Sequence, residues 1–369
     1  MSRMRKIGGA VVIVMAAALG FLGWALSHNS VCDSGPTAPS GAAPRMKAVV
    51  YRCYGPPDVL RVEDVAKPTI ADDQILVKVR AASINPLEWH YMRGTPYVMR
   101  FEVGFGRPTD PRIGVDFAGT VESVGSGVKH FHPGDEVFGG RDGALAEYVV
   151  VREDRSVVLK PANVSFEQAA GVPVAAVTAL QALRDESRVR PGQKVLINGA
   201  SGGVGTFAVQ IAKSFGAEVT AVCSTRNVSL VRSLGADHVV DYTREDFTHS
   251  GQLYDVVLDV VGNRPLLDYR PIMAPHAIFV MVGGPSTNPW LGPLIMPLKA
   301  LVLRPFLSQK FDFMLADINK PSLTALEQLM QAGKVVPVVD RTYKLAEISQ
   351  AVRYLETGHA RGKVVITMD

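Results

Sequence analysis

A strand, a turn and a helix follow one another between residues 193 and 216, and their hydrophobic pattern organises the rest of the chain. Residues 195–197 form an apolar run that leads into a glycine-rich turn at 199–205. Apolar residues then recur at helical spacing until Gly216 ends the helix, and residues 218–223 are again apolar and β-branched. This order predicts a βαβ unit inside a parallel sheet.

The turn has the glycine spacing of a nucleotide-binding loop. At a helix N-terminus, unpaired backbone N–H groups and the helix dipole both favour a pyrophosphate. A side chain at Gly202 or Gly205 would hold the cofactor or the preceding strand away. The alternative is an ordinary tight turn, but the position between a strand and a helix favours a dinucleotide site. We expect its contacts from the turn residues Ala200, Ser201, Gly202, Gly203, Val204 and Gly205.

The end of the second strand indicates which dinucleotide is bound. An NAD site usually carries Asp or Glu there to hold the ribose 2′-OH, whereas a 2′-phosphate needs a cation or hydroxyl instead. The sequence at this point is Cys223-Ser224-Thr225-Arg226, which has no acid and ends in a cation. We therefore predict NADPH, with Ser224 and Arg226 at the 2′-phosphate. In the alternative interpretation, Arg226 is an ordinary solvated loop residue.

Two other hydrophobic patterns flank this unit. Residues 46–151 contain short β-branched runs separated by turns such as 133–135, which predicts a partly open β-barrel. Residues 254–261 and 277–284 are nearly continuous apolar runs, as expected for strands buried on both faces. Paired glycines end the second run, and Gly283 is expected to allow a close approach to the nicotinamide end of the cofactor.

An uncharged apolar run at residues 7–26 follows three basic residues at the N-terminus. A helix of this length reaches about 30 Å, the thickness of a bilayer core. We therefore predict a membrane anchor over residues 1–26, with a cleavable signal peptide as the alternative. The basic residues favour a cytoplasmic N-terminus, which would place the enzyme away from cytosolic NADPH, and the sequence leaves this conflict open.

Composition narrows the remaining choices. The 369 residues suffice for about two domains, and 47% apolar with 20% charged residues is typical of a globular protein. Residues 27–45 are rich in Ser, Gly, Pro and Ala, which predicts a flexible linker that is disordered up to residue 44. The net charge of +4 comes without a dense basic run, so we expect no nucleic-acid partner. Cys32, Cys53 and Cys223 are widely separated and do not predict a disulfide framework.

Several motifs, taken together and in order, resemble the medium-chain dehydrogenase/reductase superfamily, and within it the zinc-free quinone oxidoreductase and enone reductase branch. The resemblance covers roughly residues 46–369 and rests on Ala82-Ser-Ile-Asn-Pro86, Gly114-Val-Asp-Phe-Ala-Gly-Thr-Val121, Pro133-Gly-Asp-Glu-Val137, Ala146-Glu-Tyr148, the glycine turn and Gly235-Ala-Asp-His238.

The resemblance implies an α/β fold in which a GroES-like β-barrel catalytic domain accompanies a Rossmann doubly wound parallel sheet. The implied ranges are 46–174 for the catalytic domain, 175–311 for the NADP-binding domain and 312–369 for a C-terminal return to the catalytic domain. The N-terminal hydrophobic helix has no counterpart in the family pattern.

The resemblance also bears on metals and on the reaction. In zinc-dependent members, Cys and His stand near the positions of Asn85 and Val115, and zinc prefers such ligands. We therefore predict that no metal is bound. Without a Lewis acid, hydride addition to a quinone or an α,β-unsaturated carbonyl is favoured, because the charge spreads over a conjugated system. The alternatives are a zinc-independent alcohol or aldehyde oxidoreductase, and a membrane-tethered NADPH-binding protein with little turnover.

Candidate residues outside the glycine turn follow from the same motifs. Asn85 is the first catalytic candidate because its amide can donate and accept, although Asn before Pro86 is also a common turn former. Tyr91 lies in the loop expected to cover the substrate, where packing is its alternative role. The resemblance places Thr178 and Tyr242 near the cofactor, although a helical threonine also commonly bonds its own backbone. Lys363 is expected to face the cofactor cleft or a solvated strand edge. The apolar segment 285–313 predicts a pocket wall and a homodimer contact, with contact to a membrane as the alternative.

Overall fold

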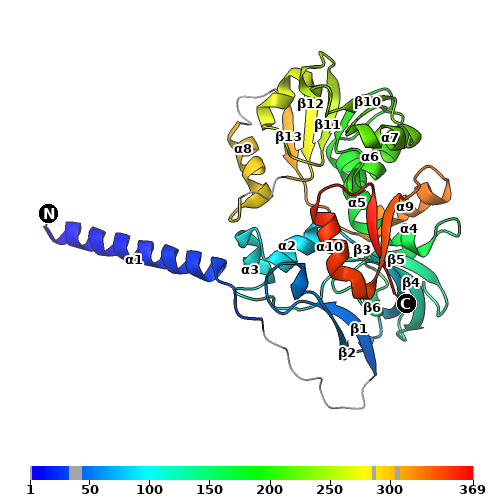
Figure 1. Ribbon diagram of the computed structural model, residues 1–369, viewed down its shortest axis with the longest axis horizontal. Coiled ribbons are helices and arrows are strands. Elements are labelled where there is room, and N and C mark those ends of the chain that lie inside the picture. Colours follow the sequence, from blue (N-terminus) through cyan, green and yellow to red (C-terminus); the bar gives the residue numbers. More distant parts are fainter. Residues whose placement is uncertain (1, 33–43, 285–287, 304–307, 369) are drawn as a thin grey trace.

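The computed structural model describes residues 2–32, 44–284, 288–303 and 308–368. Its strands form a six-stranded sheet, a seven-stranded sheet and a two-stranded ribbon. Figure 1 shows the six-stranded sheet with its helices beside the second sheet, while the N-terminal helix projects away from both. Two sheets of different character confirm the α/β fold expected from the sequence.

The six-stranded sheet is parallel throughout and has the order β10-β9-β8-β11-β12-β13. The first strand in sequence therefore lies in the middle, and the chain winds outward from it in both directions, which is the doubly wound arrangement. This confirms the predicted Rossmann sheet. Its strands are β8 (Lys194–Asn198), β9 (Glu218–Cys223), β10 (His238–Asp241), β11 (Tyr254–Asp259), β12 (Met273–Met281) and β13 (Lys310–Phe313).

Helices cover this sheet because one side of each helix is apolar. In α6, Phe207, Val209 and Ile211 are fully buried in the core that they share with β8 and β9. Burying a side chain of this size contributes about 2 kcal/mol. The helices of this part of the chain are α5 (Pro173–Gln181), followed by a π-helical turn at Ala182–Glu186, α6 (Gly203–Ser214), α7 (Val228–Ser233), α8 (Ile295–Leu303) and α9 (Lys320–Gln331).

The seven-stranded sheet is mostly antiparallel and brings the two ends of the enzyme chain together. Its order is β14-β15-β3-β4-β5-β7, with β6 also paired to β3. The last strand, β15, lies antiparallel to β3, with Val364 opposite Ile84. This register carries Lys363 to the end of β3 that leads into Asn85. The strands are β3 (Gln74–Ile84), β4 (Asp116–Val124), β5 (Glu136–Gly140), β6 (Tyr148–Arg152), β7 (Val157–Leu159), β14 (Val339–Lys344) and β15 (Lys363–Thr367), with the ribbon β1 (Arg45–Val50) and β2 (Arg61–Ala66) alongside.

Short helices close the ends of the second sheet. A separate core lies between them and the strands, with Phe117, Ile75 and Met92 almost completely buried. The helices are α2 (Pro86–Arg93), α3 (Arg100–Val103), α4 (Phe166–Ala170) and α10 (Ile348–Glu356).

The N-terminal helix exists, as α1 (Ser2–Ser27), but the predicted membrane location is wrong. Among the helices that the structure describes, none has both the length and the apolar character needed to cross a membrane. At the end of α1, Leu26 is buried, whereas Phe21 is 69% and Trp24 is 58% exposed. Trp24 stacks on the neighbouring His28.

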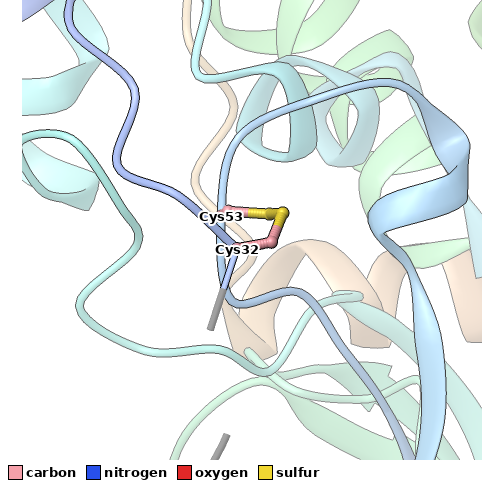
Figure 2. Close-up of a disulfide and its surroundings, with 2 residues drawn as sticks. All are labelled: Cys32 and Cys53. Atoms are coloured by element: carbon pink, nitrogen blue, oxygen red, sulfur yellow. A yellow bond between two sulfur atoms is a disulfide. The ribbon is translucent and has the colours of Figure 1, made fainter. Parts of the chain in front are cut away.

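The segment after α1 also differs from the predictions of a flexible linker and of cysteines without a disulfide framework. Cys32 and Cys53 form a disulfide (Figure 2). Cys223 is free and buried. Residues 28–32 are therefore held against the enzyme body, whereas residues 33–43 of the predicted linker lie outside the described part of the chain. A disulfide that closes a loop of 21 residues is worth about 3 kcal/mol through the entropy of the unfolded chain.

Candidate functional site

The carboxyl ends of β8 and β11 meet where the winding of the parallel sheet reverses, and ligands of such sheets bind at this point. Asn198 ends β8 and Asp259 ends β11, and the Asn198 amide donates to the Asp259 carboxylate at 2.9 Å. The hydroxyl of the buried Tyr269 donates to the same carboxylate at 2.7 Å. Burial, followed by the charge of Asp259, raises the pKa of Tyr269 far above its ordinary value. These buried bonds tie the ends of β8 and β11 together, and the sequence analysis did not single them out.

The glycine turn directly follows Asn198 at the end of β8 and is closely packed. Gly199 has a φ of +86°, and a Cβ there would lie 2.5 Å from a methyl carbon of Val261. A Cβ on Gly205 would lie 2.1 Å from the carbonyl oxygen of Gly199, so this position needs glycine for the close approach of the helix to the turn. Gly202 differs, because the nearest atom to its Cβ would be 3.5 Å away. Packing within the protein therefore explains the glycine at position 205, whereas the glycine at position 202 is left for contact with a ligand.

The other turn residues point in different directions. Ala200 is completely buried, while the hydroxyl of Ser201 accepts a hydrogen bond from the Asn227 amide at 2.9 Å. Gly203 and Val204 begin α6, where the first helical N–H groups have no partner within the helix. The structure thus brings the predicted turn residues together at one helix N-terminus.

The predicted 2′-phosphate residues lie at the end of β9. Asn227 also donates to the hydroxyl of Ser224, at 3.2 Å, and Arg226 is exposed and donates to the backbone oxygen of His359 at 3.0 Å. The Tyr242 side chain is 46% exposed. An acid that the sequence analysis overlooked, Asp241, lies close by and accepts from Thr225.

A buried polar cluster lies at the ends of β3, β4 and β15. Asp116 is its centre: one carboxylate oxygen accepts from the Ser83 hydroxyl at 2.7 Å and from the Asn85 amide at 3.0 Å. The other oxygen accepts from the backbone N–H of Val174 at 2.9 Å. The Lys363 ammonium lies 3.4 Å from Asp116 and also donates to the amide oxygen of Asn85. All the polar side chains of the cluster are buried.

Lys363 links this cluster to the glycine turn. Its ammonium contacts Asn85, while its aliphatic chain lies where a Cβ on Gly203 would be 3.2 Å from Cδ. A Cβ on Gly171 would meet the same chain at 3.1 Å. Lysine commonly buries its stem and keeps only its charge in a polar environment. The sequence left Lys363 open between the cofactor cleft and a solvated strand edge. The side chain is 3% exposed, so the strand-edge alternative is wrong, and the packing brings Lys363 between the turn and Asn85.

Glu88 is a second carboxylate that the sequence analysis missed. One oxygen accepts from the backbone N–H of Asn85 at 2.7 Å, and the other is buried with no hydrogen-bond partner among the described residues. Burial, followed by the charge of Asp116, raises the pKa of Glu88 from 4.5 to about 7, against the opposing effect of Lys363. Its spacing from Asn85 is that of a capping box, a local signal that could have found it.

The raised pKa of Glu88 makes stability depend on pH. Because folding raises this pKa from 4.5 to about 7, the folded chain holds the proton more tightly, and stability falls as pH rises through this range. The loss is about 3 kcal/mol for a shift of this size. We expect Glu88→Gln to remove most of that decline, measured as the free energy of unfolding in urea at pH 5 and pH 7.5. The exposed carboxylate variant Glu245→Gln should keep the wild-type decline, and an unchanged pH dependence in Glu88→Gln would contradict the assignment.

The remaining candidates have ordinary structural contacts. The Thr178 hydroxyl donates to the backbone oxygen of Val174 at 2.6 Å, and Tyr91 is partly buried against the barrel core. Burial raises the pKa of Tyr91 to about 12. A Cβ on Gly283 would lie 2.2 Å from the carbonyl oxygen of Val260, so its glycine is explained by a close approach of the chain to itself. In the described part of the chain, no three His, Cys, Asp or Glu side chains gather in a way that could hold a metal ion.

Two family models match this chain, one in each half of the sequence. A family model described as an alcohol dehydrogenase GroES-like domain matches residues 71–162, and one described as a zinc-binding dehydrogenase matches residues 234–366. The matched ranges contain Asn85, Asp116 and Lys363.

Named relatives match over most of their length. The chain is 37% identical to the chloroplastic NADPH-dependent alkenal/one oxidoreductase of Arabidopsis thaliana, over 93% of this chain and 84% of the relative. It is 34% identical to the chloroplastic quinone-oxidoreductase QR1 of Triphysaria versicolor, over 87% of this chain and 98% of the relative. The solved structure of the quinone oxidoreductase from Coxiella burnetii is 31% identical and superposes with a TM-score of 0.78, covering 88% of this chain and 100% of that one.

Proposed function

The chain belongs to the medium-chain dehydrogenase/reductase superfamily, among its quinone and enone reductases, and from this premise we propose how its residues work. It is an NADPH-dependent oxidoreductase that reduces quinones or α,β-unsaturated carbonyl compounds. NADPH supplies the hydride when it is bound; the chain supplies orientation and charge.

The single observation that carries the proposal is the buried contact between Lys363, Asn85 and Asp116, joined to the glycine turn by the lysine stem. In this reading, Lys363 and the Asn85 amide compensate the negative charge that develops on the substrate oxygen as the hydride is added. Asp116 holds both donors in place and balances the ammonium before the reaction.

The cofactor contacts fit the same arrangement. We propose that the N-terminal amides of α6 hold the pyrophosphate and that Lys363 lies beside them, because its stem packs against Gly203. Tyr91 would border the substrate side. The proposed cofactor residues are Thr178, Ala200, Ser201, Gly202, Gly203, Val204, Gly205, Ser224, Arg226, Tyr242, Gly283 and Lys363.

Turnover by the purified full-length chain tests the function. NADPH oxidation is followed with a simple benzoquinone, a simple enone and a saturated aldehyde. We expect turnover with the quinone or the enone and little with the aldehyde. Turnover with the aldehyde alone would favour a zinc-independent alcohol or aldehyde oxidoreductase, and NADPH binding without any turnover would favour a binding protein.

The preference for NADPH is tested at Arg226. Its guanidinium is exposed at the end of β9 and can exchange the His359 carbonyl for a phosphate. A charge-assisted hydrogen bond contributes about 1.5–3 kcal/mol, so we expect Arg226→Gln to raise the dissociation constant for NADPH about 10- to 100-fold and to leave that for NADH unchanged. Arg244→Gln, also exposed and past the end of β10, is the matched control. Equal losses for both cofactors would contradict a role at the 2′-phosphate.

A homodimer is also proposed. Its support is an apolar exposed face on α8, beside the outermost strand β13 of the parallel sheet. The exposed side chains are Leu298, Leu301 and Val302. Light scattering coupled to size exclusion is expected to give twice the mass of one chain, and a monomer at micromolar concentration would reject the proposal.

A further inference from the structure

The short segment that follows α1 is bound to the enzyme body at several points. We call residues 28–32 the N-terminal strap and residues 94–106 the cap. The backbone N–H of Ser30 donates to the carbonyl oxygen of Gly106 at 2.9 Å. Gly106 has a φ of +71°, and a Cβ there would lie 2.7 Å from the Ser30 hydroxyl. The cap therefore has a shape that accommodates the strap.

Arg100 joins the strap to the cap. It is 1% exposed, and its guanidinium donates to the carbonyl oxygens of Gly94 and His28, each at 2.8 Å, and to the side-chain oxygen of Asn29 at 2.7 Å. The guanidinium carbon also lies 4.4 Å from the ring centre of Tyr54 and 4.8 Å from that of Tyr97. Two of its three hydrogen-bond acceptors belong to the strap. A buried cation that loses its acceptors is costly, so the position of Arg100 depends on the strap.

The cap also reaches the segment that follows β12 in the chain. The backbone N–H of Tyr97 donates to the carbonyl oxygen of Pro289 at 2.7 Å, and the backbone N–H of Val98 donates to the carbonyl oxygen of Trp290 at 3.1 Å. The rings of Tyr97 and Trp290 meet edge to face at 5.1 Å. A Cβ on Gly23, in the last turn of α1, would lie 3.6 Å from the Trp290 ring. The N-terminal region thus contacts both the cap and the segment at Pro289 and Trp290.

The disulfide joins the strap covalently to the loop at Cys53 (Figure 2). Cys53 is buried, while Cys32 is on the exposed strap. The neighbouring Tyr54 donates its hydroxyl to the backbone oxygen of Gly104 at 2.7 Å. The loop that anchors the strap is therefore the loop that holds the far end of the cap.

We propose that the N-terminal strap, locked by the Cys32–Cys53 disulfide, positions the substrate cap through Arg100, so that opening the disulfide loosens the cap. This rests on the proposed function in one respect: Tyr91 is proposed to border the substrate, and we take the cap, which begins three residues later, to border it as well. Arg100 is a positioning residue, since it acts on the substrate only through the cap residues that it holds.

Hydrogen exchange tests the mechanical part without any substrate. In the full-length chain, we expect the Cys32→Ser/Cys53→Ser variant to exchange the amides of residues 97–106 at least about tenfold faster than wild type, and wild type treated with a reductant to do the same. Asn29→Ala, which removes one acceptor of Arg100 and leaves the disulfide intact, should give a smaller increase in the same residues. Cys223→Ser is the matched control, because this cysteine is free and distant in the sequence. Unchanged exchange in residues 97–106 of the double variant would overturn the proposal.

Kinetics test the link to the substrate. Thiol reductants react with quinones, so the variants are compared without reductant. We expect the double variant and Asn29→Ala to raise KM for the quinone or enone about three- to tenfold while KM for NADPH and kcat stay close to wild type. Faster exchange with an unchanged substrate KM would overturn the positioning role. Absence of turnover in wild type would reject the proposed function. The hydrogen-exchange experiment would then still test whether the strap holds the cap.

Discussion

Gly205→Ala will weaken NADPH binding strongly and lower the melting temperature. The new Cβ would lie 2.1 Å from the carbonyl oxygen of Gly199 and 2.7 Å from the backbone of Ala200. Backbone atoms cannot move aside as a flexible side chain can, so the first turn of α6 must shift away from β8. Overpacking of this kind costs about 1–3 kcal/mol, and the displaced helix N-terminus no longer presents its amides together. We expect the dissociation constant for NADPH, measured by calorimetry, to rise at least about 100-fold.

Gly202→Ala separates the two causes. The nearest atom to its Cβ would be 3.5 Å away, which is ordinary contact, so the folded chain should keep its melting temperature. Its NADPH affinity should still fall, because we propose that the cofactor lies against this position. Wild-type affinity in Gly205→Ala would contradict the pyrophosphate site, whereas wild-type affinity in Gly202→Ala would place the cofactor elsewhere along the turn.

The glycine turn could be predicted because its signals are local. A strand, the spacing of Gly199 to Gly205 and an apolar helix face are contiguous in the sequence, and each has a direct physical meaning for the backbone. The doubly wound order of the sheet follows from the same alternation of strands and helices, and the structure confirms it.

The buried cluster could be predicted only in part. Asn85 and Lys363 were singled out, but their contact depends on the antiparallel register of β15 on β3, which joins residues 278 positions apart. Asp116 lay inside a quoted motif, yet its central role depends on the meeting of three strand ends. No pattern along the chain encodes such a meeting.

The N-terminal region shows how composition can mislead. Small and polar residues at 27–45 predicted a linker. In the structure, oxygen atoms of residues 28 and 29 accept hydrogen bonds from the buried Arg100, which lies about 70 positions away in the sequence. The same holds for Cys32, whose partner is separated by 21 residues and becomes visible only when the strap is placed. Contacts between distant residues, rather than local propensity, ordered this part of the chain.

Lys363→Met is expected to have the second large effect, on both stability and catalysis. The ammonium is 3% exposed and the Asp116 carboxylate is fully buried, so solvent screens neither charge. Removing one partner of a buried pair costs about 3–5 kcal/mol, because the remaining charge is left uncompensated. In this variant, Asp116 keeps only the hydrogen bonds from Ser83, Asn85 and the Val174 amide. We expect kcat/KM with NADPH and a quinone or enone to fall at least about 100-fold, and the melting temperature to fall with it.

The double variant Lys363→Met/Asp116→Asn distinguishes the structural cost from the catalytic one. With both charges removed, the desolvation penalty disappears, so stability should recover by at least half of the loss seen in Lys363→Met. Activity should not recover, since no cation remains beside Asn85 to compensate the charge that develops on the substrate oxygen. If the double variant regained wild-type turnover, Lys363 would act only by neutralising Asp116. If Lys363→Met alone kept full activity and stability, the buried ion pair with Asp116 would be neither structural nor catalytic, and the proposed role of the lysine would be rejected.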